Sequence, residues 1–273
     1  MSRCAEDVTA LVLTVGETTF EAAVEALNNQ TTPPTSRVVV DNTVKTFHAA
    51  FNHGVAKVKT EFLLQCDADM ILDPDCIEVL RGCMTPEVGI AAAFLEDPLL
   101  GFIQAVKLFR TESVKRRPLP PTLTTDSDRA EQLHLDREKI IFVERDRPRY
   151  GHPSHVLGSH QPPYDDPLYT FGRFHRLGRK TRLRHSYPEF QNILHALKGS
   201  RHMMADHAIA ALCIGCVADR LEGPHEPFHG NAEYETYIAF ANESPPDSVI
   251  RRSTKKRVVW SGPTPNIDRG TVE

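Results

Sequence analysis

The chain lacks any apolar run long enough to cross a bilayer, and it lacks a secretory signal at its start. Its longest weakly polar segment, residues 208–218, falls well short of the roughly 20 residues that a transmembrane helix needs. Residues 1–7 (MSRCAED) do not show the basic-then-apolar order of a signal peptide. We therefore expect a soluble, cytoplasmic protein, with peripheral contact to a membrane still open.

A strong charge of one sign is missing as well, and so is a complete set of zinc-binding cysteines. The formal net charge of −4 over 273 residues does not favour a global nucleic-acid binder. Cys213 and Cys216 form a single CxxC pair, whereas a zinc site usually requires a second pair or spaced histidines. Because the pair lies in an apolar stretch typical of a core helix, we interpret both cysteines as structural.

What the sequence does contain is an alternation of short apolar strands and amphipathic helices. Strands are expected at residues 8–15, 37–40, 61–66 and 88–94. The helices between them begin near Thr19, Thr46 and Asp75. Four strands joined by three helices at this spacing predict an α/β fold with a mostly parallel central sheet and helices on both faces.

The second half has a less regular pattern. We interpret residues 107–121 as a loop, because basic side chains there are mixed with prolines, residues 126–139 as an exposed helix, and residues 146–167 as an active-site loop. A strand is expected at 140–143, and helices are expected at 167–177, 188–197 and 205–221.

Polar residues follow three of the expected strands directly. They are Gly16-Glu17, Asp41-Asn42 and Asp67-Ala68-Asp69. Because ligands of parallel α/β sheets bind beyond the carboxyl ends of the strands, we expect these residues to lie around one site.

Asp67 and Asp69 are the candidates for a metal site. Extended backbone directs both side chains to the same side. Carboxylate oxygens suit Mg²⁺ or Mn²⁺, which binds proteins through one or two carboxylates plus substrate phosphates. A cation there would offset the charge that builds on a departing diphosphate. The alternative interpretation is that Asp67 caps a helix and Asp69 is a solvated loop carboxylate.

Taken in order, these segments resemble the opening of family 2-type GT-A glycosyltransferases. The resemblance rests on TVGE at 14–17, ALNNQ at 26–30, VVVDN at 38–42, NHGVA at 52–56 and CDAD at 66–69, followed by Pro74-Asp75. It covers about residues 8–95. It implies the Rossmann-like GT-A fold and metal-dependent transfer of a sugar from a nucleotide-diphosphate sugar to an acceptor hydroxyl.

The resemblance implies a role for each matching position. The residues that would bind a UDP- or GDP-sugar are Val15, Gly16, Glu17, Asp41, Asp67 and Ala68. Asp69, with Asp67, would bind Mn²⁺ or Mg²⁺. Asp41 also has a plain interpretation as a turn carboxylate, and Glu17 as an exposed residue at a helix start. We divide the chain into a nucleotide-sugar-binding half (1–105), an acceptor-binding and catalytic half (106–243) and a C-terminal arm (244–273).

Inverting members of this family carry an acidic pair ahead of a helix that bears a basic residue. Asp165-Asp166-Pro167, followed by Arg173, resembles that arrangement, although Asp-Asp stands where Glu-Asp is usual. We take Asp166, or failing that Asp165, as the general base that removes the proton of the acceptor hydroxyl. Either aspartate also suits the cap of a helix starting at Pro167, and the two roles are compatible.

Several further residues are candidates without a firm choice. Five histidines are candidates for a further metal ligand, namely His152, His155, His160, His225 and His229. The basic stretch from Arg173 to Arg184 suits a phosphorylated acceptor, a diphosphate, an anionic membrane face or plain solvation. Tyr164 and Trp260 are candidates for stacking on a sugar or for packing. The sequence leaves the acceptor open among a glycan, a lipid-linked sugar and a small molecule. It also leaves open whether the protein forms a homodimer.

Two other functions compete with sugar transfer. Sugar-phosphate nucleotidyltransferases share the α/β sheet and the metal carboxylates. They usually carry a Gly-rich loop with Lys or Arg after the first strand, which residues 14–19 (TVGETT) do not provide. A nucleotide-sugar-binding domain without catalysis would keep the first half and lack a base.

Overall fold

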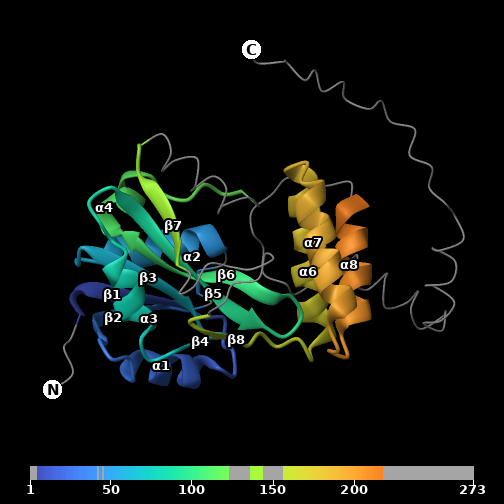
Figure 1. Ribbon diagram of the computed structural model, residues 1–273, viewed down its shortest axis with the longest axis horizontal. Coiled ribbons are helices and arrows are strands. Elements are labelled where there is room, and N and C mark those ends of the chain that lie inside the picture. The colour runs from blue at the N-terminus through green and yellow to red at the C-terminus, as the bar shows by residue number, and fades with distance from the viewer. Residues whose placement is uncertain (1–4, 42, 45, 123–135, 144–155, 218–273) are drawn as a thin grey trace, which may run out of the picture. The chain divides into compact units, whose positions relative to one another are not determined.

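The computed structural model describes residues 5–41, 43–44, 46–122, 136–143 and 156–217 (Figure 1). The elements up to the second hairpin strand are β1 (Ala5–Leu13), α1 (Phe20–Asn28), β2 (Pro34–Val40), α2 (Phe47–Lys57), β3 (Phe62–Asp67), β4 (Met70–Leu72), α3 (Cys76–Gly82), β5 (Val88–Asp97) and β6 (Gly101–Arg110). The remaining elements are α4 (Thr111–Arg116), β7 (Lys139–Val143), β8 (Gly158–His160), α6 (Pro167–Leu183), α7 (Tyr187–Gly199) and α8 (Ala205–Val217).

A single mixed sheet organises the first part of the chain, with the strand order β2-β1-β3-β6-β5-β8-β4 and β7 beside β5. β1 is parallel to β2 and β3, and β5 is parallel to β7 and β8. β6 is antiparallel to both β3 and β5, and β4 is antiparallel to β8. The α/β class and the parallel, Rossmann-like β2-β1-β3 unit expected of a GT-A-type fold are confirmed, while the antiparallel β6 was not expected.

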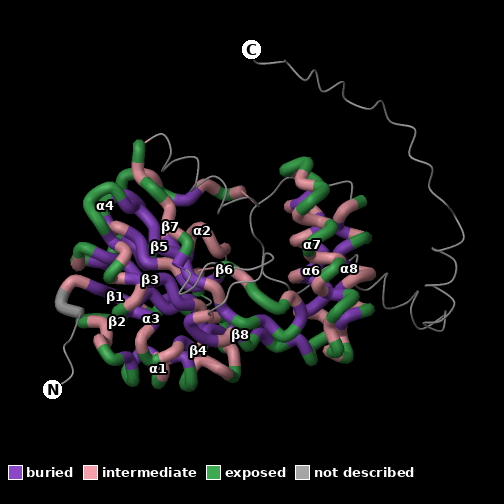
Figure 2. Tube along the Cα trace, in the orientation of Figure 1, coloured by how far each residue is buried: buried purple, intermediate pink, exposed green. Residues whose placement is uncertain are grey.

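Helices cover both faces of the sheet, as the sequence predicts. Side chains alternate across β1: Val8, Ala10 and Val12 pack in a core that includes residues of α1 and α3. Leu11 and Leu13 pack in a second core that includes residues of α2 and α4. Figure 2 shows the central strands as largely buried between these layers.

The interpretation of residues 107–121 as a loop is wrong for residues 107–116 and is confirmed for residues 117–121 alone. Lys107–Arg110 complete β6, and the next residues form the short helix α4. β6 returns from β5 through a turn at Gly101, whose φ of 77° lies in the left-handed region that favours glycine. The prolines that suggested a loop follow the strand and the helix, and they do not interrupt either. β6 also crosses residues 105 and 106, where our sequence-based division places its first boundary.

The other boundaries differ in smaller ways. The strands β4 and β8 have three residues each and carry too little pattern to be recognised in a sequence. α6 extends beyond the predicted Leu177 to Leu183. Several predictions fall outside the described residues, namely those for residues 126–135, 146–155, 218–221 and 244–273. The helix expected over 126–139 is wrong at its described end, because residues 136–137 form a turn and Lys139 begins β7.

The later helices pack closely through glycines. A Cβ atom added at Gly178 of α6 would overlap the carbonyl oxygen of Leu212 on α8, and one added at Gly215 of α8 would overlap the carbonyl oxygen of His175. The backbones of α6 and α8 therefore lie in direct contact. Within the described part of the chain, no helix is both long enough and apolar enough to span a bilayer.

Candidate active site

The carboxyl ends of β1, β2 and β3 lie side by side, as the sequence predicts. Leu13 pairs with Val40 on one side and with Asp67 on the other. The amide of Thr14 donates to the carbonyl of Val40 (3.0 Å), and the amide of Ala68 donates to the carbonyl of Leu13 (2.9 Å). The three loops that follow these strands therefore start from one edge of the sheet.

The loop after β1 is held in shape by its own side chains. The Glu17 carboxylate accepts hydrogen bonds from the Thr14 hydroxyl (2.7 Å) and from the Val15 amide (2.8 Å). Gly16 has a φ of 97°, which favours glycine. The Val15 side chain is 59% exposed. Glu17 thus braces the loop, and Val15 is its apolar outer surface beside the strand ends.

Asp41 occupies the turn after β2. Its carboxylate accepts hydrogen bonds from the Thr43 hydroxyl (2.7 Å) and the Thr43 amide (3.1 Å), and these bonds lower the pKa of Asp41. The turn-carboxylate interpretation therefore describes its contacts in the structure, and the exposed group still lies at the sheet edge. Its neighbour Asn42 lies outside the described residues.

Asp67 ends β3 and is half-buried. The amide group of Gln65 donates to its carboxylate (3.4 Å). Burial, together with the nearby charge of Asp69, raises the pKa of Asp67 to about 7. A carboxylate pair of this kind favours the binding of a positive charge, because a cation would stabilise both ionised groups.

Ala68 is buried and joins two loops of the site. Its carbonyl oxygen accepts a hydrogen bond from the Thr19 hydroxyl (2.9 Å), so the loop before α1 is bonded to the segment between the two aspartates. Thr19 lies at the N-cap position of α1, near which the sequence predicts the start of this helix, but its side chain makes no capping hydrogen bond.

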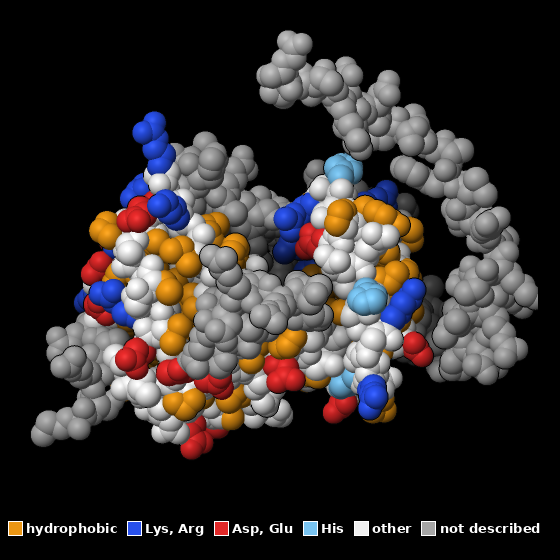
Figure 3. Space-filling view, in the orientation of Figure 1, with side chains coloured by type: hydrophobic (Ala, Val, Ile, Leu, Met, Phe, Trp, Pro, Cys, Tyr) orange, Lys and Arg blue, Asp and Glu red, His pale blue; other side chains and the backbone are white. Residues whose placement is uncertain are grey.

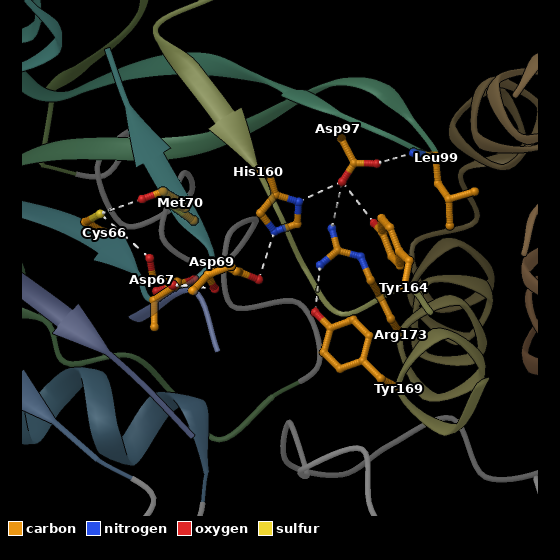
Figure 4. A network of polar contacts seen from close by, with 12 residues as sticks. Cys66, Asp67, Asp69, Met70, Asp97, Leu99, His160, Tyr164, Tyr169 and Arg173 are labelled. Atoms are coloured by element: carbon orange, nitrogen blue, oxygen red, sulfur yellow. Dashed lines mark hydrogen bonds and ion pairs between the residues drawn. The ribbon is translucent and has the colours of Figure 1, made fainter. Parts of the chain in front are cut away.

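Asp69 is buried and faces His160 of β8 (Figure 4). Its Oδ2 atom lies 3.2 Å from Nε2 of His160, whereas its Oδ1 atom is buried without a hydrogen-bond partner. Burial by itself raises the pKa of a carboxyl group, but the hydrogen bond and charge of His160 outweigh it, and the pKa of Asp69 is lowered. Asp69 is therefore an ionised carboxylate with one oxygen still to be satisfied.

Asp97, at the end of β5, is a site residue that the sequence reasoning missed. Its side chain is fully buried, and its Oδ2 atom lies 2.7 Å from Nδ1 of His160 and accepts a hydrogen bond from the Tyr164 hydroxyl (2.9 Å). The amides of Leu99 and Leu100 donate to Oδ1 (2.9 and 2.7 Å). Burial opposes ionisation, but His160 and Arg173 outweigh it and hold the pKa of Asp97 at about 2.

His160 therefore lies between two carboxylates. Burial and the nearby Arg173 act to lower the pKa of its imidazole, but the hydrogen bonds to Asp69 and Asp97 prevail and raise it. Among the five candidate histidines, His160 alone belongs to the described residues, and the four others lie outside them. The apolar pattern of the sequence ends at residue 94, three residues before Asp97, so no local sequence signal indicates this cluster.

Helix α6 contributes a cation to the same cluster. The Arg173 guanidinium lies 3.8 Å from Asp97 Oδ2 and donates to the Tyr169 hydroxyl (3.5 Å). It also lies over the ring of Tyr164 at 5.6 Å. Tyr164 is buried in this contact, so its interpretation as a residue that stacks on a sugar is wrong, and its companion Trp260 lies outside the described residues.

The acidic pair precedes α6 as expected. The amides of Leu168 and Tyr169 donate to Asp166 Oδ1 (2.9 and 3.4 Å), so Asp166 caps the helix that begins at Pro167. The Asp165 side chain is 88% exposed and lies 3.9 Å from His202. Capping engages one oxygen of Asp166 and does not occupy the whole carboxylate.

The donor set of Asp67 and Asp69 fits Mg²⁺ or Mn²⁺. Both ligands are hard oxygens, and the buried Oδ1 of Asp69 has no other partner. Among the described residues, no group of three His, Cys, Asp or Glu side chains is arranged so that it could hold a metal ion.

The basic stretch of α6 forms no uniform patch. Arg182 and Arg184 are exposed, whereas Arg176, Arg179 and Lys180 are half-buried. On the face shown in Figure 3, acidic, basic and hydrophobic side chains of the described residues are interspersed. This distribution agrees with the small net charge of the chain.

No protein-family model matches the chain, and no curated protein sequence matches it either. S. aureus TarS (its residues 1–349) in complex with UDP-GlcNAc aligns with a TM-score of 0.43 and 12% identity, over 75% of this chain and 79% of TarS. Glucosyl-3-phosphoglycerate synthase from Mycobacterium tuberculosis, in complex with Mn²⁺, UDP and phosphoglyceric acid, aligns with a TM-score of 0.37 and 12% identity, over 53% of this chain and 72% of that one.

A third similar structure is 2-C-methyl-D-erythritol 4-phosphate cytidylyltransferase from Thermus thermophilus. Its TM-score is 0.37 at 15% identity, over 54% of this chain and 94% of that one. Because all three TM-scores lie below 0.5, these similarities assign neither a family nor an activity to the chain.

Proposed function

We propose that this protein is a glycosyltransferase that moves a sugar from a UDP- or GDP-sugar to an acceptor hydroxyl, with Mn²⁺ or Mg²⁺ bound at Asp67 and Asp69. The observation that carries the proposal is the meeting of two carboxylates with the β1 and β2 loops at one edge of the sheet. In open α/β sheets, this edge is where ligands bind.

Different residues at this edge would bind different parts of the donor. The exposed Val15 side chain offers an apolar surface to a nucleobase, and Asp41 offers a carboxylate at the neighbouring strand end. Asp67 and Asp69 would hold the cation, which when bound offsets the charge that builds on the departing diphosphate. Arg173 carries a further positive charge within the same cluster.

Transfer breaks the bond between the anomeric carbon and the diphosphate oxygen, and it forms a bond from that carbon to the acceptor oxygen. The acceptor hydroxyl must lose its proton, and Asp166, or failing that Asp165, is the proposed base for an inverting displacement. Asp166 is suited both to capping α6 and to acting as the base, because the two capping hydrogen bonds use Oδ1 alone.

The test combines binding and turnover. The purified protein is incubated with UDP- and GDP-sugars and acceptors, with Mn²⁺ or with a chelator, and release of the nucleoside diphosphate is measured. We expect the nucleoside diphosphate to be released only when the metal is present, and we expect Asp69→Asn to abolish this release. The control Glu25→Gln also removes one negative charge, from the exposed face of α1, and should retain activity.

The outcomes separate the candidate functions. Release of pyrophosphate from a nucleoside triphosphate and a sugar phosphate would indicate a nucleotidyltransferase instead. Metal-dependent donor binding without turnover across the acceptors would indicate a binding domain. Donor binding that is indifferent to both the metal and Asp69 would contradict the proposed site.

A further inference from the structure

The imidazole of His160 is clamped at both nitrogens. Nδ1 lies 2.7 Å from Asp97 Oδ2, and Nε2 lies 3.2 Å from Asp69 Oδ2. The side chain of His160 is 3% exposed, and that of Asp97 is fully buried. Figure 4 shows the three side chains in a row between β8, the end of β5 and the segment after β3.

We propose that His160, held by Asp97, is a positioning residue that fixes the Asp69 carboxylate so that its Oδ1 atom is presented to the divalent cation. The inference rests on the proposed function, since it concerns the cation assigned to Asp67 and Asp69. It gives His160 a role behind the metal ligand and not in direct contact with the metal.

The two oxygens of Asp69 differ in a way that supports this role. Oδ2 faces His160, whereas Oδ1 is buried with no hydrogen-bond partner. A buried acceptor without a partner is costly to maintain, so such an atom is a natural ligand position. Metal-binding carboxylates are commonly oriented by a hydrogen bond to their second oxygen, which is the contact that His160 makes.

Asp97 determines where His160 points. Its Oδ1 atom is bonded to the amides of Leu99 and Leu100, and its Oδ2 atom accepts from Tyr164 as well as facing His160. With both oxygens engaged by separate parts of the chain, the Asp97 carboxylate cannot rotate freely. The ring of His160 is therefore held with Nε2 toward Asp69.

The same geometry argues against His160 as a metal ligand in its own right. A ligand nitrogen needs its lone pair directed at the ion, but Nε2 is directed at an oxygen of Asp69. In the part of the chain that the structure describes, Asp67, Asp69 and His160 do not converge as a three-ligand group. Pulsed EPR of bound Mn²⁺ distinguishes the two roles, because a coordinated imidazole nitrogen gives a strong coupling.

Two substitutions of His160 separate positioning from plain structural support. The amide nitrogen of the shorter side chain in H160N lies about where Nδ1 was, so it retains the contact with Asp97 and loses Asp69. The amide nitrogen of the longer side chain in H160Q lies about where Nε2 was, so it retains the contact with Asp69 and loses Asp97. The measurement is UDP affinity by calorimetry over a series of Mn²⁺ concentrations, with metal-free UDP affinity and circular dichroism as folding controls.

We expect H160N to raise the Mn²⁺ concentration needed for half-maximal enhancement of UDP binding by about 10–100-fold, the usual effect of losing a hydrogen bond to a metal ligand. H160Q should raise it by less than H160N does, although it gives up the contact with Asp97. Metal-free UDP affinity should be equal in all three proteins.

Three results would overturn the inference. They are an unchanged Mn²⁺ requirement in H160N, a larger loss in H160Q than in H160N, and a directly coordinated imidazole nitrogen in wild-type protein. Wild-type UDP binding that does not respond to Mn²⁺ would instead overturn the metal site of the proposed function, and the positioning role with it.

Discussion

Asp97 illustrates what a single residue contributes to this site. The sequence pattern ends the fourth strand at residue 94, whereas β5 continues to Asp97. The Asp97 side chain lies in a buried cluster with His160, Tyr164 and Arg173. In the sequence, Glu96-Asp97-Pro98 looks like a turn. Its role follows from partners that lie far along the chain, so no local pattern indicates it.

We predict that the stability contributed by Asp97 depends on pH. Its folded pKa of about 2 lies below the ordinary value of about 3.9 in an unfolded chain. The contribution is therefore fully present above pH 4 and is lost as the pH falls toward 2, and it amounts to about 2–3 kcal/mol. Urea unfolding of wild type and Asp97→Asn from pH 6 to pH 3 should show the difference in unfolding free energy shrinking.

The exposed Asp165 provides the control for this measurement. Asp165→Asn removes the same charge from a side chain that is 88% exposed, and it should change stability by less than about 0.5 kcal/mol at every pH. If the wild-type and Asp97→Asn curves instead stay parallel over this range, the ionised carboxylate of Asp97 does not stabilise the fold.

We predict that Asp166→Asn separates the two roles of this residue. Asn is as good a helix N-cap as Asp, so α6 should keep its stability. The Asn amide cannot take up the proton that the acceptor hydroxyl loses, so the turnover rate should fall by a factor of about 10²–10⁴ while donor affinity persists. Steady-state kinetics and calorimetry measure the two effects. Undiminished turnover in both Asp166→Asn and Asp165→Asn, or a product that retains the donor's anomeric configuration, would contradict the assignment.

At the level of secondary-structure elements, β6 shows why a strand with basic residues resembles a loop in the sequence. Val106, Leu108 and Phe109 are buried, while Lys107 and Arg110 are half-buried. Arg110 bonds Glu61 (2.9 Å) and lies over the ring of Phe62 at 5.2 Å. Basic residues whose stems pack on neighbouring strands thus break the apolar pattern without breaking the strand.

The contact between α6 and α8 leads to a prediction about a glycine. A methyl group at Gly215 would overlap the carbonyl oxygen of His175, which belongs to the backbone and cannot turn aside. We expect Gly215→Ala to lower the free energy of unfolding by about 1–3 kcal/mol, the usual cost of overpacking. Gly199→Ala in α7 is the matched control, since a methyl group there meets no atom within 4 Å, and it should be neutral or stabilising by up to about 1 kcal/mol. Equal effects in urea unfolding would contradict direct backbone contact between the helices.

At the scale of the whole molecule, the proposed site joins binding to folding. The loops after β1 and β3 are bonded to each other through Thr19 and Ala68, and Asp97 connects the sheet to α6 through Arg173. A ligand that binds the folded state alone should stabilise all of these parts together.

We predict that UDP with Mn²⁺, at 100 times the dissociation constant, raises the free energy of unfolding by about 2.7 kcal/mol. Asp69→Asn should abolish this increase and leave the unliganded protein folded. Thermal and urea unfolding with and without Mn²⁺ measure it. An increase of the same size in Asp69→Asn would place the nucleotide away from this carboxylate.

Local sequence patterns are enough to predict the alternation of strands and helices, the α/β class and the position of Asp67 and Asp69 at a strand end. These features depend on side-chain periodicity and on backbone preferences within a few residues, which are local properties. The tertiary structure alone decided that β6 enters the sheet between β3 and β5, and that Asp69 faces His160 with Asp97 behind it. Those contacts join segments that are distant in the chain, and only the packing of the folded sheet brings them within hydrogen-bonding distance.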